Sequence, residues 1–330
     1  GRRDNKYKAR IKILVKAEGQ KFIDAVEAEY RAILEQDGAP HTITRAELER
    51  VQAGFEVPPL RAAGVASETS ISAKPFQRWL AQNVRQHRLP ELSIVTLSFK
   101  RPGWAPGDAD AATLDALAEL ADTFSAGEAR LTHEQNLLLP WVHAQNLPAL
   151  YERARALGLV QPNIGLLTDM IACPGGDFCA LANARAIPIA AALTELYQDI
   201  DEVTDLGPID LHISGCINSC GHHHSGHIGI LGVDKDGKEW YQVTLGGSDG
   251  SALSGPATPG KVVGPSFSAA EVPGVVEAIL DSYRELRTSA AEHFIDTLRR
   301  VGHDPFKQAA NAARLDGHHR SARQAEEVAA

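Results

Sequence analysis

The segment ACPGGDFCALANAR (residues 172–185) is followed, 26 residues further along, by HISGCINSCGHHHSGHIG (residues 212–229), and together they hold all four cysteines of the chain. Cys173 and Cys179 are separated by five residues, Cys216 and Cys220 by three, and 36 residues lie between the two pairs. Four thiols in so short a span predict that they share one structural or metal-binding task.

Three kinds of site use four cysteines, and their spacing distinguishes them. Disulfides need an oxidising compartment, and the sequence does not start with the apolar segment and cleavage site of a secreted protein. Structural zinc prefers pairs with two intervening residues, which neither pair has, although the nearby histidines keep zinc open as an alternative. A [4Fe-4S] cluster accepts wider spacings because its irons lie at the corners of a cube. Among these three, we favour the cluster; the glycines support it, since they let backbone N–H groups approach the sulfur atoms.

The composition is that of a globular protein, with 44% hydrophobic and 23% charged residues among 330. The net charge of −9 offers no electrostatic footprint for nucleic acid or an anionic membrane, so a small anion would need a local basic pocket. No apolar run reaches 18 residues, so we expect a cytoplasmic protein. No G-x-G-x-x-G follows a predicted strand, which argues against a flavin or nicotinamide site.

The hydropathy patterns predict an α+β (mixed α/β) chain. A strand is expected over residues 10–15, and a linker over residues 56–75. Asp110 is expected to cap a helix that ends near Phe124. The other predicted helices cover residues 20–38, 76–84, 146–159, 180–198 and 269–287, and the other predicted strands cover residues 92–99, 128–142, 210–214, 227–233 and 240–247.

The cysteine segments CPGGDFC and SGCINSCG resemble the sirohaem and [4Fe-4S] signature of the assimilatory nitrite and sulfite reductase family. LTHEQNLLL (residues 131–139), TLGG (residues 244–247) and RRDNKYKARIK (residues 2–12) resemble further segments of that family, so the resemblance extends over about residues 1–305. It departs from the family at Ile217, where many relatives have proline, and at the triple histidine after Cys220, where an arginine is common.

The resemblance implies the C-terminal portion of a pseudo-two-fold duplicated architecture, in which this chain is a fragment that we expect to be inactive alone. The implied parts are the end of the first sirohaem-binding repeat with a linker (1–66), a ferredoxin-like half-domain (67–160), a sirohaem and [4Fe-4S] binding domain (161–307) and a disordered tail (308–330).

The resemblance also implies the cofactors and their ligands. Cys173, Cys179, Cys216 and Cys220 would hold the [4Fe-4S] cluster, and Cys220 would also be the axial ligand of the sirohaem iron. Arg10 and Lys12 would contact the substrate anion, and the remaining anion-binding residues would lie in the other half of the enzyme. The residues expected to line the cofactor are Arg130, Thr132, Gln135, Asn136, Arg185, Asn218 and His222.

The implied activity is the six-electron reduction of sulfite to sulfide in sulfur assimilation, with nitrite to ammonia as the alternative. Electrons would come from ferredoxin or a flavoprotein subunit. Two other classes stay open: a haem-free iron–sulfur electron-transfer protein, and a zinc-stabilised interaction module. An absorption spectrum and metal analysis distinguish these classes, because only sirohaem gives strong chlorin-type bands.

Overall fold

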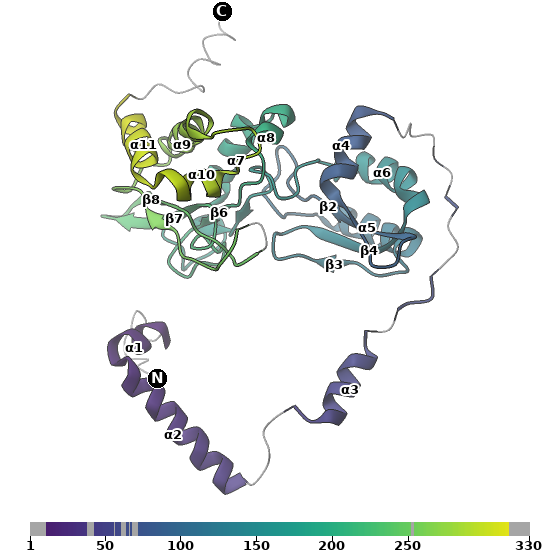
Figure 1. The fold of residues 1–330 in the computed structure, drawn as a ribbon, viewed down its shortest axis with the longest axis horizontal. Helices are drawn as coiled ribbons and strands as arrows, with labels where there is room; N and C mark the ends of the chain where they lie inside the picture. The colour runs from purple at the N-terminus through teal and green to yellow at the C-terminus, as the bar shows by residue number, and fades with distance from the viewer. Residues whose placement is uncertain are drawn as a thin grey trace, which may run out of the picture. The chain divides into compact units, whose positions relative to one another are not determined.

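The computed structural model describes residues 11–37, 43–55, 57–60, 64–65, 67, 72–251 and 254–316. The chain divides into two compact units, residues 1–58 and 59–330 (Figure 1). Within the described part of the chain, no helix is long and apolar enough to cross a membrane.

The first unit is helical where it is described, with α1 (Ile11–Glu18), α2 (Gln20–Asp37) and α3 (Arg45–Ala53). The prediction of a strand over residues 10–15 is wrong for residues 11–15. The short apolar run also has helical spacing, because Leu14 and Val15, its half-buried members, lie three and four residues after Ile11. The helix predicted over residues 20–38 is confirmed as α2.

The second unit begins with an antiparallel sheet covered by helices. The sheet has the strand order β1-β2-β4-β3, and α4, α5 and α6 share one apolar core with β2 and β4. Asp110 caps α5 as predicted, since its side chain accepts a hydrogen bond from the backbone N–H of Thr113. The elements are α4 (Lys74–Asn83), β1 (Val84–Gln86), β2 (Leu92–Leu97), α5 (Ala111–Phe124), β3 (Arg130–Leu131), β4 (Leu137–His143), η2 (Ala144–Asn146) and α6 (Leu147–Ala156).

A five-stranded mixed sheet forms the rest of the second unit, with the order β5-β6-β7-β8-β9. β5, β6 and β7 are parallel, whereas β8 and β9 are antiparallel to their neighbours. Helices α7 to α11 lie on one side of β6 to β8 in Figure 1 and bury one apolar core. The elements are β5 (Ile171–Ala172), η3 (Gly175–Asp177), α7 (Ile187–Leu196), α8 (Ile200–Leu206), β6 (Leu211–Ser214), β7 (Ile228–Lys235), β8 (Lys238–Leu245), β9 (Lys261–Val262), α9 (Val272–Leu286), α10 (Phe294–Val301) and α11 (Asp304–Asp316).

The α+β class is confirmed, and three local predictions need correction. The single strand predicted over residues 128–142 is two strands, β3 and β4, because the polar segment between them forms a turn with Gln135 at φ +58°. The helix predicted over residues 180–198 begins only at Ile187, since the residues before it pair with the second cysteine loop. The predicted disordered tail is helical over residues 308–316, where α11 buries Ala310; residues 317–330 lie outside the described residues.

Candidate functional site

The two cysteine loops leave the same edge of the mixed sheet. Cys173 directly follows β5, and Cys216 lies just beyond the end of β6. β5 and β6 are adjacent and parallel, with Ala172 opposite Ile213, so their carboxyl ends bring both loops together. The fold thus explains how thiols 36 residues apart in sequence reach one place.

Backbone hydrogen bonds join the two loops at Gly215. The N–H of Gly215 donates to Cys173 Sγ at 3.1 Å, and its carbonyl accepts from the N–H groups of Asn183 and Ala184 at 2.8 and 3.0 Å. The N–H of Cys173 donates to the carbonyl of Ile213 at 3.1 Å. This bond therefore ties the sulfur atom of the first loop to the backbone of the second.

Two glycines in the second loop leave no room for a side chain. A Cβ atom on Gly215 would lie 2.6 Å from the carbonyl oxygen of Ala184, and one on Gly221 would lie 2.0 Å from the carbonyl oxygen of Ile213. Both neighbours are backbone atoms, which cannot rotate away. Glycine is therefore required for the close packing of the cysteine loops.

The four cysteines are free thiols in the structure, so none of them forms a disulfide there, and they differ in exposure. Cys216 is buried, Cys173 and Cys179 are half-buried, and Cys220 is exposed. Among the described residues, no three His, Cys, Asp or Glu side chains form a group that could hold a metal ion. A [4Fe-4S] cluster does not require such convergence, because each thiolate binds a different iron.

The histidines after Cys220 have separate environments. The His222 side chain is exposed, and its carbonyl lies 3.0 Å from His212 Nδ1. His223 is buried, with Nδ1 3.2 Å from Ser219 Oγ, and its ring lies 3.9 Å from that of His224 between centroids. His222 and His224 are therefore exposed and His223 is buried, and of the three only His222 was expected to line the cofactor.

A buried histidine lies behind the second loop. His227 Nδ1 accepts a hydrogen bond from the N–H of Asp210 at 3.2 Å, so the neutral ring carries its proton on Nε2, which lies 2.8 Å from Ser254 Oγ. Burial lowers the pKa of His227 and of neighbouring His212, and the carboxylate of Asp210 only partly opposes this. Both rings are therefore held neutral near pH 7.

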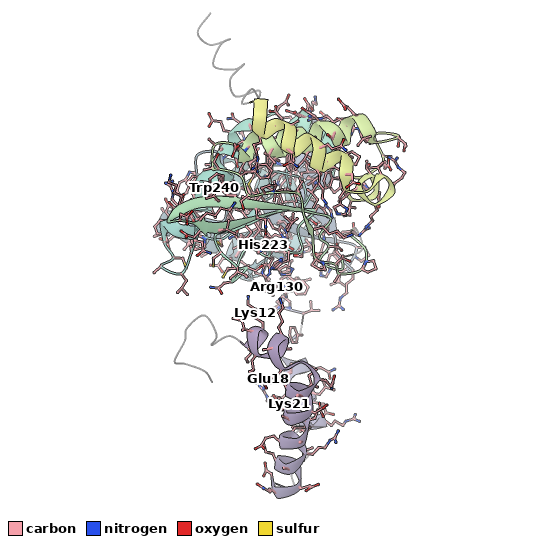
Figure 2. All side chains as sticks on the ribbon, turned by 90° about the vertical axis from the view of Figure 1, so that its left-hand side faces the viewer. Lys12, Glu18, Lys21, Arg130, His223 and Trp240 are labelled. Carbon is pink, nitrogen blue, oxygen red and sulfur yellow. The ribbon has the colours of Figure 1, made fainter. Side chains whose placement is uncertain are left out.

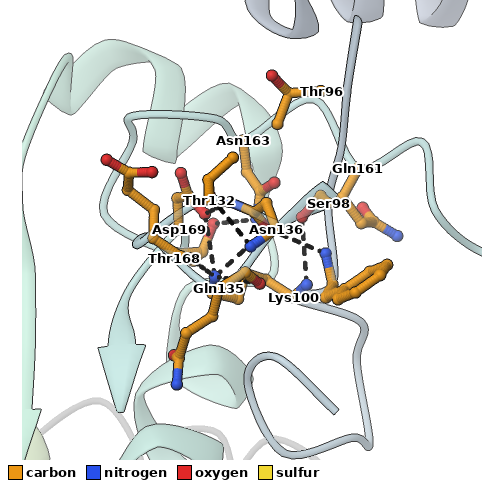
Figure 3. A network of polar contacts seen from close by, with 12 residues as sticks. Thr96, Ser98, Lys100, Thr132, Gln135, Asn136, Gln161, Asn163, Thr168 and Asp169 are labelled. Carbon is orange, nitrogen blue, oxygen red and sulfur yellow. Dashed lines mark hydrogen bonds and ion pairs between the residues drawn. The ribbon is translucent and has the colours of Figure 1, made fainter. Parts of the chain in front are cut away.

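Gln135 and Asn136, expected to line the cofactor, both form hydrogen bonds through their side-chain amides, and Figure 3 shows the network around Asn136. Gln135 Nε2 donates to the carbonyl of Ala172 at 2.8 Å, and its Oε1 accepts from the N–H of Ala172 at 3.0 Å. Asn136 Nδ2 donates to Asp169 Oδ1 at 2.8 Å, and its Oδ1 accepts from the N–H of Phe99 at 3.1 Å. Both side chains therefore have partners within the protein, Asn136 is buried, and their role at the cofactor remains a prediction.

A buried ion pair beside this turn was not foreseen from the sequence. Lys100 Nζ lies 3.3 Å from Asp169 Oδ1, and both side chains are almost fully buried. Burial lowers the pKa of Lys100 and raises that of Asp169, and each partner's charge opposes the shift of the other. Asp169 also accepts from the N–H of Gly165 at 2.9 Å, so the carboxylate is well satisfied.

The remaining expected site residues are dispersed. Arg130 is bound to Glu128, with Nε 2.6 Å from Oε1. Arg185 is directed to Glu239, with Nε 3.2 Å from Oε2, and its expected contact with a sirohaem carboxylate remains a prediction. The other placements are Thr132 at the half-buried start of the β3–β4 turn, Asn218 half-buried between Cys216 and Cys220, Lys12 exposed on α1 (Figure 2), and Arg10 outside the described residues.

A cavity of about 470 Å³ lies between the two sheets, lined by Thr96 and Thr132 on one side and Ile171 and His212 on the other. Its charged lining is mainly acidic, since it has one basic residue, Arg85, and the four acidic residues Glu134, Asp169, Asp210 and Asp249. One of these acidic residues, Asp169, is already paired with Lys100. None of the four cysteines is among the residues that line this cavity, and Cys220 is the exposed one of the four.

The fold and the site define an α+β iron–sulfur protein. Residues 166–317 match the family model described as nitrite and sulphite reductase 4Fe-4S domain, and residues 97–157 match that of the nitrite/sulfite reductase ferredoxin-like half domain. The chain belongs to the nitrite and sulfite reductase family, as the sequence motifs predicted. The ferredoxin-like half-domain is confirmed, and the implied cofactors are a [4Fe-4S] cluster and sirohaem.

Relatives of both activities match the chain. A chloroplastic ferredoxin–nitrite reductase of Betula pendula is 37% identical over 192 residues, which are 56% of this chain and 32% of that protein. A ferredoxin sulfite reductase of Mycolicibacterium paratuberculosis is 29% identical over 265 residues, 76% of this chain and 40% of that protein. The structure of the Mycobacterium tuberculosis NirA protein matches with a TM-score of 0.58 and 25% identity over 93% of this chain and 50% of that one. The chain spans about a third of the nitrite reductase's length.

Proposed function

We propose that this chain is the cluster-binding part of a sirohaem and [4Fe-4S] enzyme that reduces sulfite to sulfide. The observation that supports the proposal is the pair of cysteine loops, which follow the adjacent parallel strands β5 and β6 and are joined by hydrogen bonds at Gly215 within the matched 4Fe-4S family domain. The cluster and sirohaem, when bound, would supply the single-electron steps of this reduction.

The proposed roles of the cysteines follow their exposure. Cys173, Cys179 and Cys216, which are half-buried or buried, would ligate the cluster only. Cys220 is the exposed member of the set and would serve both the cluster and the sirohaem iron. The Gly215 N–H would stabilise the negative charge on Cys173 in either redox state.

Sulfite is proposed as the substrate because the sulfite reductase relative matches over 76% of the chain, compared with 56% for the nitrite reductase of Betula pendula. Nitrite is the second candidate, favoured by that relative's higher identity of 37%. Both relatives are named for ferredoxin, so we propose ferredoxin as the electron donor. Arg10 and Lys12 are proposed as anion contacts that act together with groups from the rest of the enzyme.

The rates of sulfite and nitrite reduction by the full-length enzyme, with reduced ferredoxin as donor, test the substrate. We expect a higher kcat/KM for sulfite. A higher value for nitrite would favour the second candidate, and no turnover of either anion by cluster-loaded and haem-loaded enzyme would overturn the proposal.

Serine variants of the cysteines test the ligand assignment in the full-length enzyme. Cys173→Ser should lose or degrade the cluster, because a hydroxyl is a poor replacement for a thiolate, whereas Cys220→Ser should change the haem spectrum as well. Ile217→Ser is the matched control, since it places a serine at an exposed position of the same loop. Iron and sulfide analysis with absorption and Mössbauer spectra measures both centres. An unaltered coupled spectrum in Cys220→Ser would remove that residue from the bridging role.

A further inference from the structure

β5 is a two-residue strand at the edge of the mixed sheet, and the backbone of its second residue, Ala172, is hydrogen-bonded by a side chain from the half-domain that holds the other sheet. On its inner side β5 pairs with β6, and the N–H of Cys173 donates to the carbonyl of Ile213. The N–H and carbonyl of Ala172 bond on the other side, where the described residues supply no further strand to the sheet. Ala172 is buried, and buried backbone groups need partners.

Gln135 supplies both partners. Its carboxamide accepts from the Ala172 N–H at 3.0 Å and donates to the Ala172 carbonyl at 2.8 Å, as a peptide group of a neighbouring strand would do. Glutamine carries a donor and an acceptor at every pH on a side chain of this length, whereas asparagine is one carbon shorter and glutamic acid donates only when it is protonated. The side chain therefore completes the edge of the second sheet from the first.

The turn that carries Gln135 is held in place. The backbone of Gln135 has φ +58°. A Cβ atom on Gly107 would lie 2.8 Å from the Cβ atom of Gln135, so Gly107 packs directly against the Gln135 side chain. Lys100 Nζ lies 3.3 Å from the Gln135 carbonyl and is paired with Asp169 (Figure 3). A carboxamide mounted on a fixed turn can fix the position of whatever it bonds.

We propose that Gln135 is a positioning residue for Cys173. Gln135 fixes Ala172, the next residue is Cys173, and Cys173 Sγ then meets the N–H of Gly215. The inference rests on the proposed function, in which Cys173 ligates the cluster. The ferredoxin-like half-domain thereby sets the position of the first cluster ligand without touching the cluster.

Two substitutions separate the two hydrogen bonds. Gln135→Ala removes both. Gln135→Glu keeps the acceptor for the Ala172 N–H but loses the donor to its carbonyl while the carboxyl is ionised, and regains the donor when the carboxyl is protonated. Gln86→Glu is the matched control, since Gln86 lies in the same half-domain and donates to the carbonyl of Pro90 at 3.2 Å.

Amide hydrogen exchange of the holoprotein gives the first readout. In Gln135→Ala, exchange at the Ala172 amide should be faster by roughly 10-fold, the factor that one ordinary hydrogen bond represents. In Gln135→Glu that amide should stay protected, because the acceptor remains. Unchanged exchange in Gln135→Ala, or equal loss of protection in both variants, would overturn the proposal.

The rate of iron release to a chelator, expressed at each pH as a ratio to the parent, gives the second readout. Gln135→Ala should release iron faster at every pH by roughly 10-fold. Gln135→Glu should do so at pH 8 and approach the parent as the pH falls toward the ordinary pKa of a glutamic acid, about 4.3, because its carboxyl then gains the donor proton. The titratable groups around the turn are present in the parent as well, so the ratio removes their own titration; they are Lys100, His133, Glu134 and Asp169.

Three outcomes would contradict the second expectation: release at the parental rate in Gln135→Ala, a pH-independent ratio in Gln135→Glu, or faster release in the Gln86→Glu control. If the parent takes up no iron and sulfide, the proposed function fails. Exchange at Ala172 still decides whether the Gln135 contact orders the segment that carries Cys173.

Discussion

Replacement of Gly215 by alanine should separate the two cysteine loops. The new Cβ would lie 2.6 Å from the Ala184 carbonyl oxygen and 2.8 Å from Gly175 Cα, and both are backbone atoms. Gly215 also forms three of the hydrogen bonds between the loops, with Cys173 Sγ and the N–H groups of Asn183 and Ala184. The substitution therefore acts on the contact that holds the proposed cluster ligands together.

The cost follows from these distances. An ordinary carbon contact of about 3.5 Å requires the loops to move apart by roughly 0.9 Å. That movement stretches the hydrogen bond from Asn183 N, now 2.8 Å, beyond the ordinary range. Loss of two or three hydrogen bonds at about 1 kcal/mol each, with about 1 kcal/mol of overpacking strain, destabilises the unit by about 3–4 kcal/mol. The melting temperature should fall by roughly 6–12 °C.

Thermal unfolding followed by circular dichroism measures this loss, and the iron and sulfide content measures the cluster. Gly237→Ala is the control: Gly237 lies in the β7–β8 turn, and no described atom lies within 4 Å of the place its methyl group would take, although its φ of +74° makes the change cost about 1 kcal/mol. If Gly215→Ala loses no more stability than Gly237→Ala and binds a full cluster, the close packing of the loops does not hold the ligands.

Three further predictions address the other charged groups. Lys100→Met should lower the free energy of unfolding by about 3–5 kcal/mol, because it leaves the Asp169 carboxylate buried without its cation. Urea unfolding measures this loss, and the double variant with Asp169→Leu should recover part of the lost free energy of unfolding. Burial lowers the pKa of His227 in the folded chain, so the unfolded chain takes up a proton there more readily, and the chain should lose stability below pH 6.5. In His227→Gln the melting temperature should therefore depend less on pH between 7 and 5. Arg185→Gln should change the free energy of unfolding by less than about 1 kcal/mol and leave the haem content unchanged, because the guanidinium pairs with Glu239 at the surface. A loss of haem would instead support a role for Arg185 in binding the cofactor.

The sequence was sufficient for features that depend on local pattern. Asp110 and the helix after it follow from a capping residue and helical spacing, and both are present in the structure. The cysteine spacing identified the family because cluster ligands must recur at fixed separations. The strand expected over residues 10–15 failed because so short a segment, with four apolar residues, suits either a helix or a strand, and only contacts made elsewhere decide between them.

The roles of the polar residues could not be predicted, because they depend on partners distant in sequence. Gln135 and Asn136 stand in a motif that suggested a cofactor surface, yet their amides bond to Ala172 and Asp169, 37 and 33 residues away. Lys100 carries no sequence signal, since a lone lysine after a strand is ordinarily solvated. Only the fold places a buried carboxylate beside it.

The contacts at Ala172 and Gly215 connect the half-domain to the cluster loops in series. Gln135 bonds Ala172, Cys173 accepts from Gly215, and Gly215 in turn accepts from the segment that follows Cys179. Each link is a direct hydrogen bond between groups on neighbouring segments, so displacement of one link displaces the next. Cys220 lies outside this series and is the exposed cysteine, whereas Cys216 is buried and Cys173 and Cys179 are half-buried. The contacts of this series therefore act on Cys173 and on the segment after Cys179, and none of them involves Cys220.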